Sequence, residues 1–341
     1  MRRLFIWLGL AAALCVQAAT PVPDLGNARI VVLANNLQNY YYNYDESSRP
    51  SYDTDAGRAE KTRKIVQMML GSNADIFAFC EVEAKPITLN YLVSELNDAV
   101  GDSAYAAVAD GINVTTDSYD NAIKSGFVYK IATVAPYGSN YAATNVTYYK
   151  NVMRIQAWTE LSTGERFTLS MNHFKAMSDE ASVAKRVDNA NWLMSGLAMS
   201  SKVKDPDILI MGDLNCEMDE EAISVIEQKG YAEQLLRFDE DAYSYIYRGN
   251  QELIDHAFAN STMAEQITGA AVWHTNTSVT YSNRYSDHDA VMVGLRLGEE
   301  EDTSGIEPTQ APSSARKEIR QGQLIIIRGG QHYTVTGVRL R

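Results

Sequence analysis

The side chains that can do chemistry in this chain gather in six short segments between residues 36 and 289. Each segment combines carboxylate, carboxamide or imidazole side chains, and most of them directly follow an apolar run. The segments are Asn36–Asn39, Cys80–Glu83, Asn172–Lys175, Gly212–Asn215, Ile254–His256 and Ser286–Asp289. Strand ends present site residues from a rigid scaffold, so this arrangement predicts one site built at the ends of several strands.

This set of side chains fits a metal-assisted attack on a phosphoester. The oxygens of a phosphodiester repel nucleophiles, so an enzyme must neutralise that charge, activate a water and stabilise the leaving oxygen. Mg²⁺ prefers carboxylates, carbonyls and waters. We therefore expect Mg²⁺ or Mn²⁺ as the cofactor, with Glu81, Asp287, Asn36 and Gln38 as candidate ligands.

Asp213 and Asn215 stand two residues apart and would face the same side if their strand continues. The Asp could then orient and deprotonate the attacking water, and the Asn could hold a phosphate oxygen. The alternative for Gly-Asp-Leu-Asn is a simple turn after a buried strand.

Four of the five histidines fall in or near these segments. His173 and His288 are the candidates to face a phosphate, and each needs a carboxylate to fix its tautomer. His256 should point away from Asp255 and is expected to be a core histidine. His274 either packs at the core or rim or contacts the substrate.

Two further features allow both a functional and an ordinary interpretation. Lys175 either contacts a phosphate or is simply solvated. The cluster Tyr40, Tyr41, Tyr42 and Tyr44 either stacks unpaired bases or covers the core.

The order of the six segments resembles the endonuclease/exonuclease/phosphatase superfamily, which includes DNase I, over roughly residues 28–298. Its secreted bacterial nucleases are the most similar branch, on the segments Asn121–Lys130, Tyr243–Tyr247, Leu253–Ala257, Val272–Asn276 and Tyr285–Val291.

The resemblance implies roles for several residues. Glu81 would be the principal metal ligand, Asp255 would orient His288, and Asn121 would contact the substrate. The partner of His173 is expected near residues 120–124. Gln38 stands where the abasic-site endonucleases carry an Asp, so only one metal is expected.

Helical periodicity around residues 58–70, 89–100 and 183–197, among many short apolar runs, predicts an α/β protein. The resemblance makes the fold class specific: a four-layer, DNase I-like sandwich of two mixed β-sheets flanked by helices, with the site at one rim.

The two ends of the chain differ from its middle. Residues 1–19 resemble a signal peptide, which predicts export to the periplasm, the cell surface or the medium. Lipidation at Cys15 is disfavoured by Leu14. A catalytic domain is expected over 20–298, a linker over 299–315 and a β-hairpin over 316–341. That hairpin resembles the sorting tails of secreted Bacteroidetes proteins; the alternative is an extra hairpin packed on the main domain.

Export makes a disulfide between Cys80 and Cys216 chemically feasible, but their places at strand ends favour buried free thiols.

Net charge argues against an extended nucleic-acid surface. The chain carries −13, and residues 20–298 carry −15 once the basic first 19 residues (+2), the acidic linker (−5) and the basic tail (+5) are set aside. DNA-binding surfaces are normally basic. A local positive site made by a metal and a few Lys or Arg side chains would still suffice.

Three functions remain open at this point. The first is a secreted nuclease acting on extracellular DNA, with RNA as an additional candidate substrate. The second is a phosphatase or phospholipase acting on inositol phosphate, sphingomyelin or another small phosphoester. The third is an inactive surface-binding module, which the complete set of site residues disfavours. Nucleic acid is the expected partner; no stable protein partner and no membrane insertion after signal cleavage are expected.

Overall fold

The computed structural model describes residues 20–41, 55–83, 86–109, 123–142, 153–199, 203–298, 316–320, 323–328, 331–334 and 339–340. The chain divides into two compact units between Gly298 and Glu299. Asn121, Tyr42 and Tyr44 lie outside the described residues.

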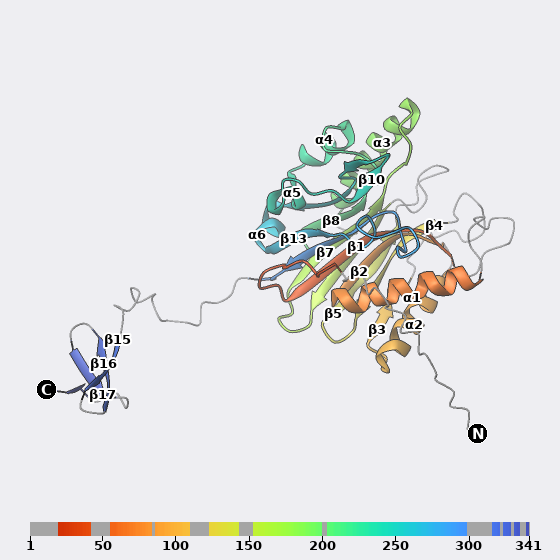
Figure 1. Cartoon of the computed structure of the whole chain (residues 1–341). Coiled ribbons are helices and arrows are strands. Elements are labelled where there is room, and N and C mark those ends of the chain that lie inside the picture. The colour runs from red at the N-terminus through yellow and green to blue at the C-terminus, as the bar shows by residue number, and fades with distance from the viewer. Residues whose placement is uncertain are drawn as a thin grey trace, which may run out of the picture. The chain divides into compact units, whose positions relative to one another are not determined.

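The first unit contains two six-stranded sheets (Figure 1). The first sheet has the order β13-β14-β1-β2-β4-β3, formed by Ile267–Trp273, Ala290–Leu295, Ile30–Tyr40, Ile76–Glu83, Ile123–Lys130 and Tyr105–Ala107. The second has the order β5-β6-β7-β8-β12-β9, formed by Val134–Ala142, Met153–Glu160, Arg166–His173, Ile208–Asp213, Asp255–Asn260 and Tyr231–Glu233. Both sheets are mixed, because β1–β2 and β7–β8 pair in parallel and their other pairs are antiparallel.

Alternating side chains explain why the two sheets pack face to face. In β1, Val32 and Ala34 enter one core cluster, which also takes residues from β6, β7, β8 and β12, whereas Leu33 and Leu37 enter another. Successive side chains of a strand point to opposite faces of the sheet. A strand that is buried on both faces therefore has a continuous run of apolar residues in its sequence. The first cluster is therefore the core between the sheets.

Helices cover the two outer faces (Figure 1). The helices α1 (Asp55–Ser72) and α2 (Pro86–Val100) pack on the first sheet, with Ile65, Met69, Leu92 and Leu96 buried. On the second sheet pack α3 (Glu180–Leu197) and α4 (Glu221–Glu227), with Ala190, Leu193, Ile223 and Ile226 buried. The short helices α5 and α6 span Leu235–Phe238 and Ser261–Glu265. This gives the four layers predicted from the resemblance.

The helices cover the stretches that the periodicity predicted. Each begins a few residues earlier than expected: α1 at Asp55 rather than 58, α2 at Pro86 rather than 89, and α3 at Glu180 rather than 183. For α3 the cause is an N-cap, because Asp179 accepts a hydrogen bond from the Ser182 N–H. None of the helices in the described ranges has the length and apolar character that a bilayer span requires.

Two smaller sheets complete the description. A two-stranded hairpin, β10 (Tyr245–Tyr247) and β11 (Asn250–Glu252), turns at Arg248 and Gly249, both with positive φ. The second unit, residues 299–341, contains a four-stranded antiparallel sheet of β15 (Arg316–Arg320), β16 (Gln323–Arg328), β17 (Gln331–Thr334) and β18 (Arg339–Leu340). The expected hairpin corresponds to β16 and β17, and the sheet adds a strand on each side of it.

Gly212 is a position where only glycine fits. Its φ is +128°, and a Cβ there would lie 2.2 Å from the Asn172 carbonyl oxygen on the neighbouring strand β7. We predict that Gly212→Ala destabilises the protein by at least about 3 kcal/mol, because an unfavourable φ and a backbone overlap add up. Urea unfolding followed by circular dichroism measures this.

Gly164→Ala is the matched control for that substitution. Gly164 also has a positive φ, +82°, but an added Cβ would meet no atom within 4 Å. It should cost only the ~1–2 kcal/mol of the backbone conformation. Equal losses for the two variants would show that the contact with Asn172 is relieved by a small shift.

Candidate active site

The rows of side chains that fill the core between the sheets end in polar residues at one rim. Leu209 and Met211 in β8 are followed by Asp213 on the same face, and Leu169 and Met171 in β7 by His173. In the same way Asn36 follows Ala34 in β1, and Asp255 precedes Ala257 in β12. The alternation of the strands therefore aims these four side chains into one space.

Glu81 reaches the same space through an irregularity in its strand. Ile76, Ala78 and Cys80 face the inner core, so regular alternation would point Glu81 outward. The register of β2 shifts against β4 between Phe79 and Val82, and Glu81 has a φ of +53°. A bulge of this kind re-aims a side chain, and here it turns Glu81 to the rim.

Asn36 ties the two sheets together at this rim. Its Nδ2 donates to Glu81 Oε1 at 3.0 Å and to Asp213 Oδ2 at 2.9 Å, and its Oδ1 accepts from the Gln38 N–H at 2.8 Å. The other Glu81 oxygen accepts from the Asn39 N–H at 2.8 Å. Asn36 thus orients two carboxylates with its N–H groups. The expected role of its side-chain oxygen as a metal ligand stays a prediction.

His173 lies between the same two carboxylates. Its Nε2 is 3.6 Å from Glu81 Oε1 and 3.7 Å from Asp213 Oδ2. The acid expected near residues 120–124 falls mostly outside the described residues, which resume at Ile123. Glu81 and Asp213 are therefore the acidic neighbours of His173 that the structure describes here.

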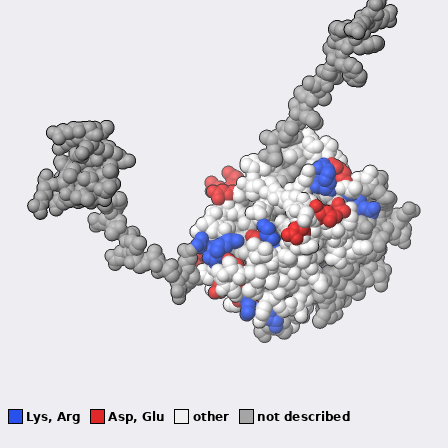
Figure 2. All heavy atoms as spheres, turned by 90° about the horizontal axis from the view of Figure 1, so that it is seen from below, with Lys and Arg blue, Asp and Glu red and all other residues white. Residues whose placement is uncertain are grey.

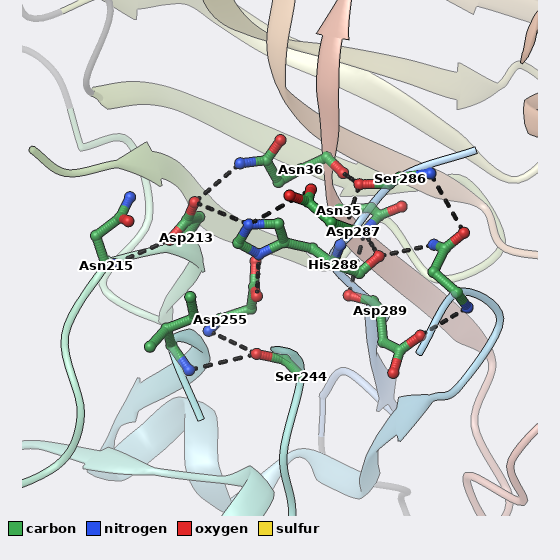
Figure 3. Close-up of polar contacts among 12 residues, drawn as sticks. Asn35, Asn36, Asp213, Asn215, Ser244, Asp255, Ser286, Asp287, His288 and Asp289 are labelled. Atoms are coloured by element: carbon green, nitrogen blue, oxygen red, sulfur yellow. Dashed lines mark hydrogen bonds and ion pairs between the residues drawn. The ribbon is translucent and has the colours of Figure 1, made fainter. Parts of the chain in front are cut away.

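His288 and Asp255 form a buried ion pair across the two sheets (Figure 3). The Nδ1 of His288 is 2.7 Å from Asp255 Oδ2, and its Nε2 is 3.8 Å from Asp213 Oδ2. Burial alone would lower the pKa of His288, but the negative charges of Asp255, Asp213 and Asp287 outweigh it and hold the pKa well above its usual value. The imidazole is thus favoured in its cationic form, which suits contact with a phosphate.

Asp213 and Asn215 do not continue one strand, so the condition for their facing the same side is not met and the chain turns there instead. The strand β8 ends at Asp213, and Asn215 adopts a left-handed conformation with φ +52°. The Asn215 N–H donates to Asp213 Oδ1 at 2.9 Å, and its side-chain amide donates to the Phe174 carbonyl at 3.2 Å. A turn closed by the Asp side chain, rather than strand parity, brings the two residues together.

Three other candidate residues lie around this centre. Asp287 has a partly exposed side chain, with Oδ1 3.9 Å from His288 Nε2, and burial raises the pKa of its carboxyl group. Gln38 lies in the bulge at the end of β1, with φ +48°, and its carbonyl accepts from Lys61 Nζ at 2.6 Å. Lys175 lies just beyond β7, where its N–H donates to Asn189 of α3.

The donor atoms fit a hard divalent cation. Ligand atoms of Glu81, His173 and Asp213 all lie within 4.8 Å of one another. The side chains of Glu81 and Asp287 are 18% and 31% exposed, so both can reach an ion at the mouth of the site. Oxygen atoms dominate this set, which is the preference of Mg²⁺ and Mn²⁺.

Two other histidines and a tyrosine make their contacts outside this centre. His256 is fully buried, with Nδ1 2.8 Å from Glu233 Oε2 and Nε2 2.9 Å from the Cys216 carbonyl, which confirms the core prediction. His274 lies at the rim, 2.7 Å from Asp289 Oδ2, and stacks on Tyr243.

Tyr40 is fully buried and bonded to Thr62, so base stacking by Tyr40 is excluded. Cys80 and Cys216 are buried free thiols.

Sequence reasoning missed the residues that support this centre. Ser244 Oγ accepts from the Asp255 N–H at 3.0 Å, and the ring of the next residue, Tyr245, lies over His288 at 4.7 Å. Asn35 Nδ2 donates to the Asp289 carbonyl at 3.1 Å. The sequence did contain one signal for these residues, an amide or hydroxyl side chain inside an apolar or aromatic run. Such a polar group is costly to bury unless it is hydrogen-bonded, so its presence there indicates a buried partner.

Comparison with solved structures finds the same fold in proteins of 11–17% identity. A mannosyl-6-phosphatase from Bacteroides thetaiotaomicron has 17% identity and a TM-score of 0.55, covering 79% of this chain and 100% of its own. An endonuclease/exonuclease/phosphatase from Bacteroides vulgatus has 15% identity and a TM-score of 0.57, covering 79% and 99%. A 3′ phosphatase from Neisseria bound to a product DNA hairpin has 11% identity and a TM-score of 0.51, covering 79% and 100%.

No curated protein matches the sequence significantly. The model of the Endonuclease/Exonuclease/phosphatase family matches residues 36–288, which run from the first site residue, Asn36, to the last, His288. Members of this family are metal-dependent phosphoester hydrolases. This chain belongs to the Endonuclease/Exonuclease/phosphatase family.

Proposed function

We propose that this protein is a secreted, divalent-metal-dependent nuclease that hydrolyses extracellular DNA. The observation that carries the hydrolytic part is the rim itself, where three carboxylates, two imidazoles and an amide face one space. Of this set, Figure 3 shows the side chains of Asn36, Asp213, Asp255 and His288. The Neisseria relative is bound to DNA, which supports a nucleic acid as the substrate class. Secretion rests on the signal-like first 19 residues.

The carboxylates of Glu81 and Asp287, with the side-chain oxygens of Asn36 and Gln38, would hold the metal. When bound, it would neutralise the phosphate charge and polarise the scissile bond. Asp213, fixed by Asn36, orients the attacking water and accepts its proton. His288, held by Asp255, donates its Nε2–H to a phosphate oxygen, and His173 faces the same anion.

The remaining candidates bind the substrate. Asn215 keeps a second amide N–H besides the one that bonds Phe174, and it would meet the oxygen that gains charge as the bond breaks. Lys175 and Asn121 would contact neighbouring phosphates.

A phosphatase acting on a small phosphoester is the second candidate, and the charge of the domain favours it. Residues 20–298 carry −15. On the face shown in Figure 2, Lys and Arg alternate with Asp and Glu among uncharged residues, without a continuous basic band among the described residues. The mannosyl-6-phosphatase among the similar structures belongs to this substrate class.

The first prediction about the activity concerns the metal. Chelation should abolish hydrolysis, and Glu81→Gln should lower kcat/KM by at least about 100-fold, because even residues behind metal ligands cost ~10–100-fold when changed. Hydrolysis of plasmid DNA by the purified protein, with and without added Mg²⁺, measures both effects.

Glu60→Gln is the control for Glu81→Gln. Glu60 is an exposed acid of α1 that pairs with Arg63, and its loss should leave the rate unchanged. Full turnover in excess chelator by metal-free protein would refute the metal mechanism.

The second prediction concerns the His288–Asp255 pair. His288→Ala and Asp255→Asn should each lower kcat by about 10²–10⁴-fold, the range of general acid–base and charge-stabilising groups. The double variant should be little worse than the worse single one, since the two residues act as a unit. Steady-state kinetics on the four proteins tests this, and independent, multiplying losses would show that Asp255 does not orient His288.

The third prediction separates the two substrate classes. If DNA is the substrate, few phosphates are contacted, so log KM should rise with log salt with a slope of only about 2–4, as for two to four neutralised phosphates. Plasmid cleavage at fixed Mg²⁺ and increasing NaCl gives the slope. A steep slope would reveal an extended basic track, and phosphomonoester hydrolysis without DNA cleavage at any salt would assign the protein to the phosphatases.

A further inference from the structure

The segment that carries His288 is held by side chains rather than by a strand. Residues 285–289 precede β14, which begins at Ala290. Within the segment, Ser286 Oγ donates to the Asn36 carbonyl at 2.6 Å and accepts from the His288 N–H at 3.2 Å (Figure 3). The position of the imidazole therefore depends on contacts with residues distant in sequence.

Asn276 contacts both ends of this segment with one side chain. Its Nδ2 donates to the His288 carbonyl at 2.7 Å. Its Oδ1 accepts from the Tyr285 N–H at 3.1 Å and the Ser286 N–H at 3.3 Å. Asn276 is fully buried, so these three bonds are shielded from competing water.

The position of Asn276 is itself fixed by the residue after His288. Its backbone N–H donates to Asp289 Oδ1 at 2.8 Å, and the Thr277 N–H donates to the same oxygen at 2.9 Å. Asp289 is fully buried, and its Oδ2 is 2.7 Å from His274 Nδ1. Residues 274–277 thus both donate hydrogen bonds to residues 285–289 and accept hydrogen bonds from them.

The geometry points to Asn276 as a positioning residue for His288, an inference that rests on the proposed role of His288 in phosphoester hydrolysis. His288 precedes a strand of the first sheet, whereas Asp255 begins a strand of the second. No ladder of backbone hydrogen bonds joins these two strands. Ser244 links the two sides, because its carbonyl accepts from the Asp289 N–H at 2.8 Å and its Oγ from the Asp255 N–H at 3.0 Å. Asn276 acts on the other side of His288, where it fixes the backbone of residues 285–288 on which the imidazole stands, so both contacts set the 2.7 Å between Nδ1 and Oδ2.

A purely structural role for Asn276 makes a different prediction. Removing the side chain leaves the buried N–H groups of Tyr285 and Ser286 without their acceptor, which lowers stability in either case. A structural role would lower the fraction of active protein by the same factor whether or not His288 is present. A positioning role affects catalysis only through His288, because misplacement by about 1 Å can cost about 10²-fold.

The test is a kinetic cycle of wild type, Asn276→Ala, His288→Ala and the double variant, with full-length protein, saturating Mg²⁺ and bis(p-nitrophenyl) phosphate. We expect Asn276→Ala to lower kcat by about 10–100-fold with KM nearly unchanged. In the His288→Ala background the same substitution should cause no further loss. Ser278→Ala, which removes a hydroxyl of the same turn that donates to the His274 carbonyl, should leave kcat unchanged.

Asn276→Asp repeats the cycle if Asn276→Ala does not fold. It keeps an acceptor for Tyr285 and Ser286 but places an oxygen against the His288 carbonyl, and the same coupling is expected. Equal fold-losses in both backgrounds, with His288→Ala impaired, would overturn the positioning role alone. Unimpaired His288→Ala would overturn that role together with the proposed function of His288.

Discussion

The convergence of carboxylates at one rim is the constraint on which the rest of the structure depends. Glu81, Asp213 and Asp255 are brought there by three different strands, and two of them are almost completely buried. Two like charges 4 Å apart repel by about 4 kcal/mol at the effective dielectric near a protein surface. Such a group is stable only with N–H donors, cationic imidazoles or a metal ion among its members.

The protein supplies the first two kinds of compensation from its own residues. The Asn36 amide donates to Glu81 and Asp213 together, so one neutral side chain satisfies oxygens from both sheets. His288 bonds Asp255 and lies near Asp213, and the same negative field that must be neutralised raises the pKa of its imidazole. The field that remains at Glu81 and Asp287 would attract a divalent cation. Stability and catalysis therefore depend on the same charges.

The sequence predicted the parts of this arrangement that follow from strand parity and residue type. Asn36, His173, Asp213 and Asp255 continue inner-facing rows, so their convergence follows from alternation once the two sheets are known. Glu81 does not follow from alternation, because its orientation depends on a bulge and a positive φ at a residue that rarely adopts one. Its residue type and its place at a strand end made it a candidate ligand, but its orientation could not be predicted from the sequence.

The hydrogen-bond partners of the supporting residues could not be predicted from the sequence for a different physical reason. Ser286 bonds the carbonyl of Asn36, which lies 250 positions earlier in the chain, and Asn35 bonds carbonyls 253 and 254 positions away. No local pattern encodes such contacts, since they exist only after both sheets have packed. Whether Asn215 continues the strand was left open by the sequence, because the choice depends on a turn that is closed by a hydrogen bond to Asp213.

The candidate hydrolytic residues and the exposed aromatic residues beside them belong to different elements of the fold. The hydrolytic set stands at the ends of buried strands, whereas the mouth is lined by the half-buried Tyr245 and continues into the exposed Ile246 and Tyr247 of the β10–β11 hairpin. Residues on such hairpins and loops change without disturbing the core. The same fold is found in a mannosyl-6-phosphatase and in a 3′ phosphatase bound to a product DNA hairpin, and one fold can host sites for different substrates. Under the proposed function, the side chains around the site would select the substrate, and the buried centre would carry out the reaction.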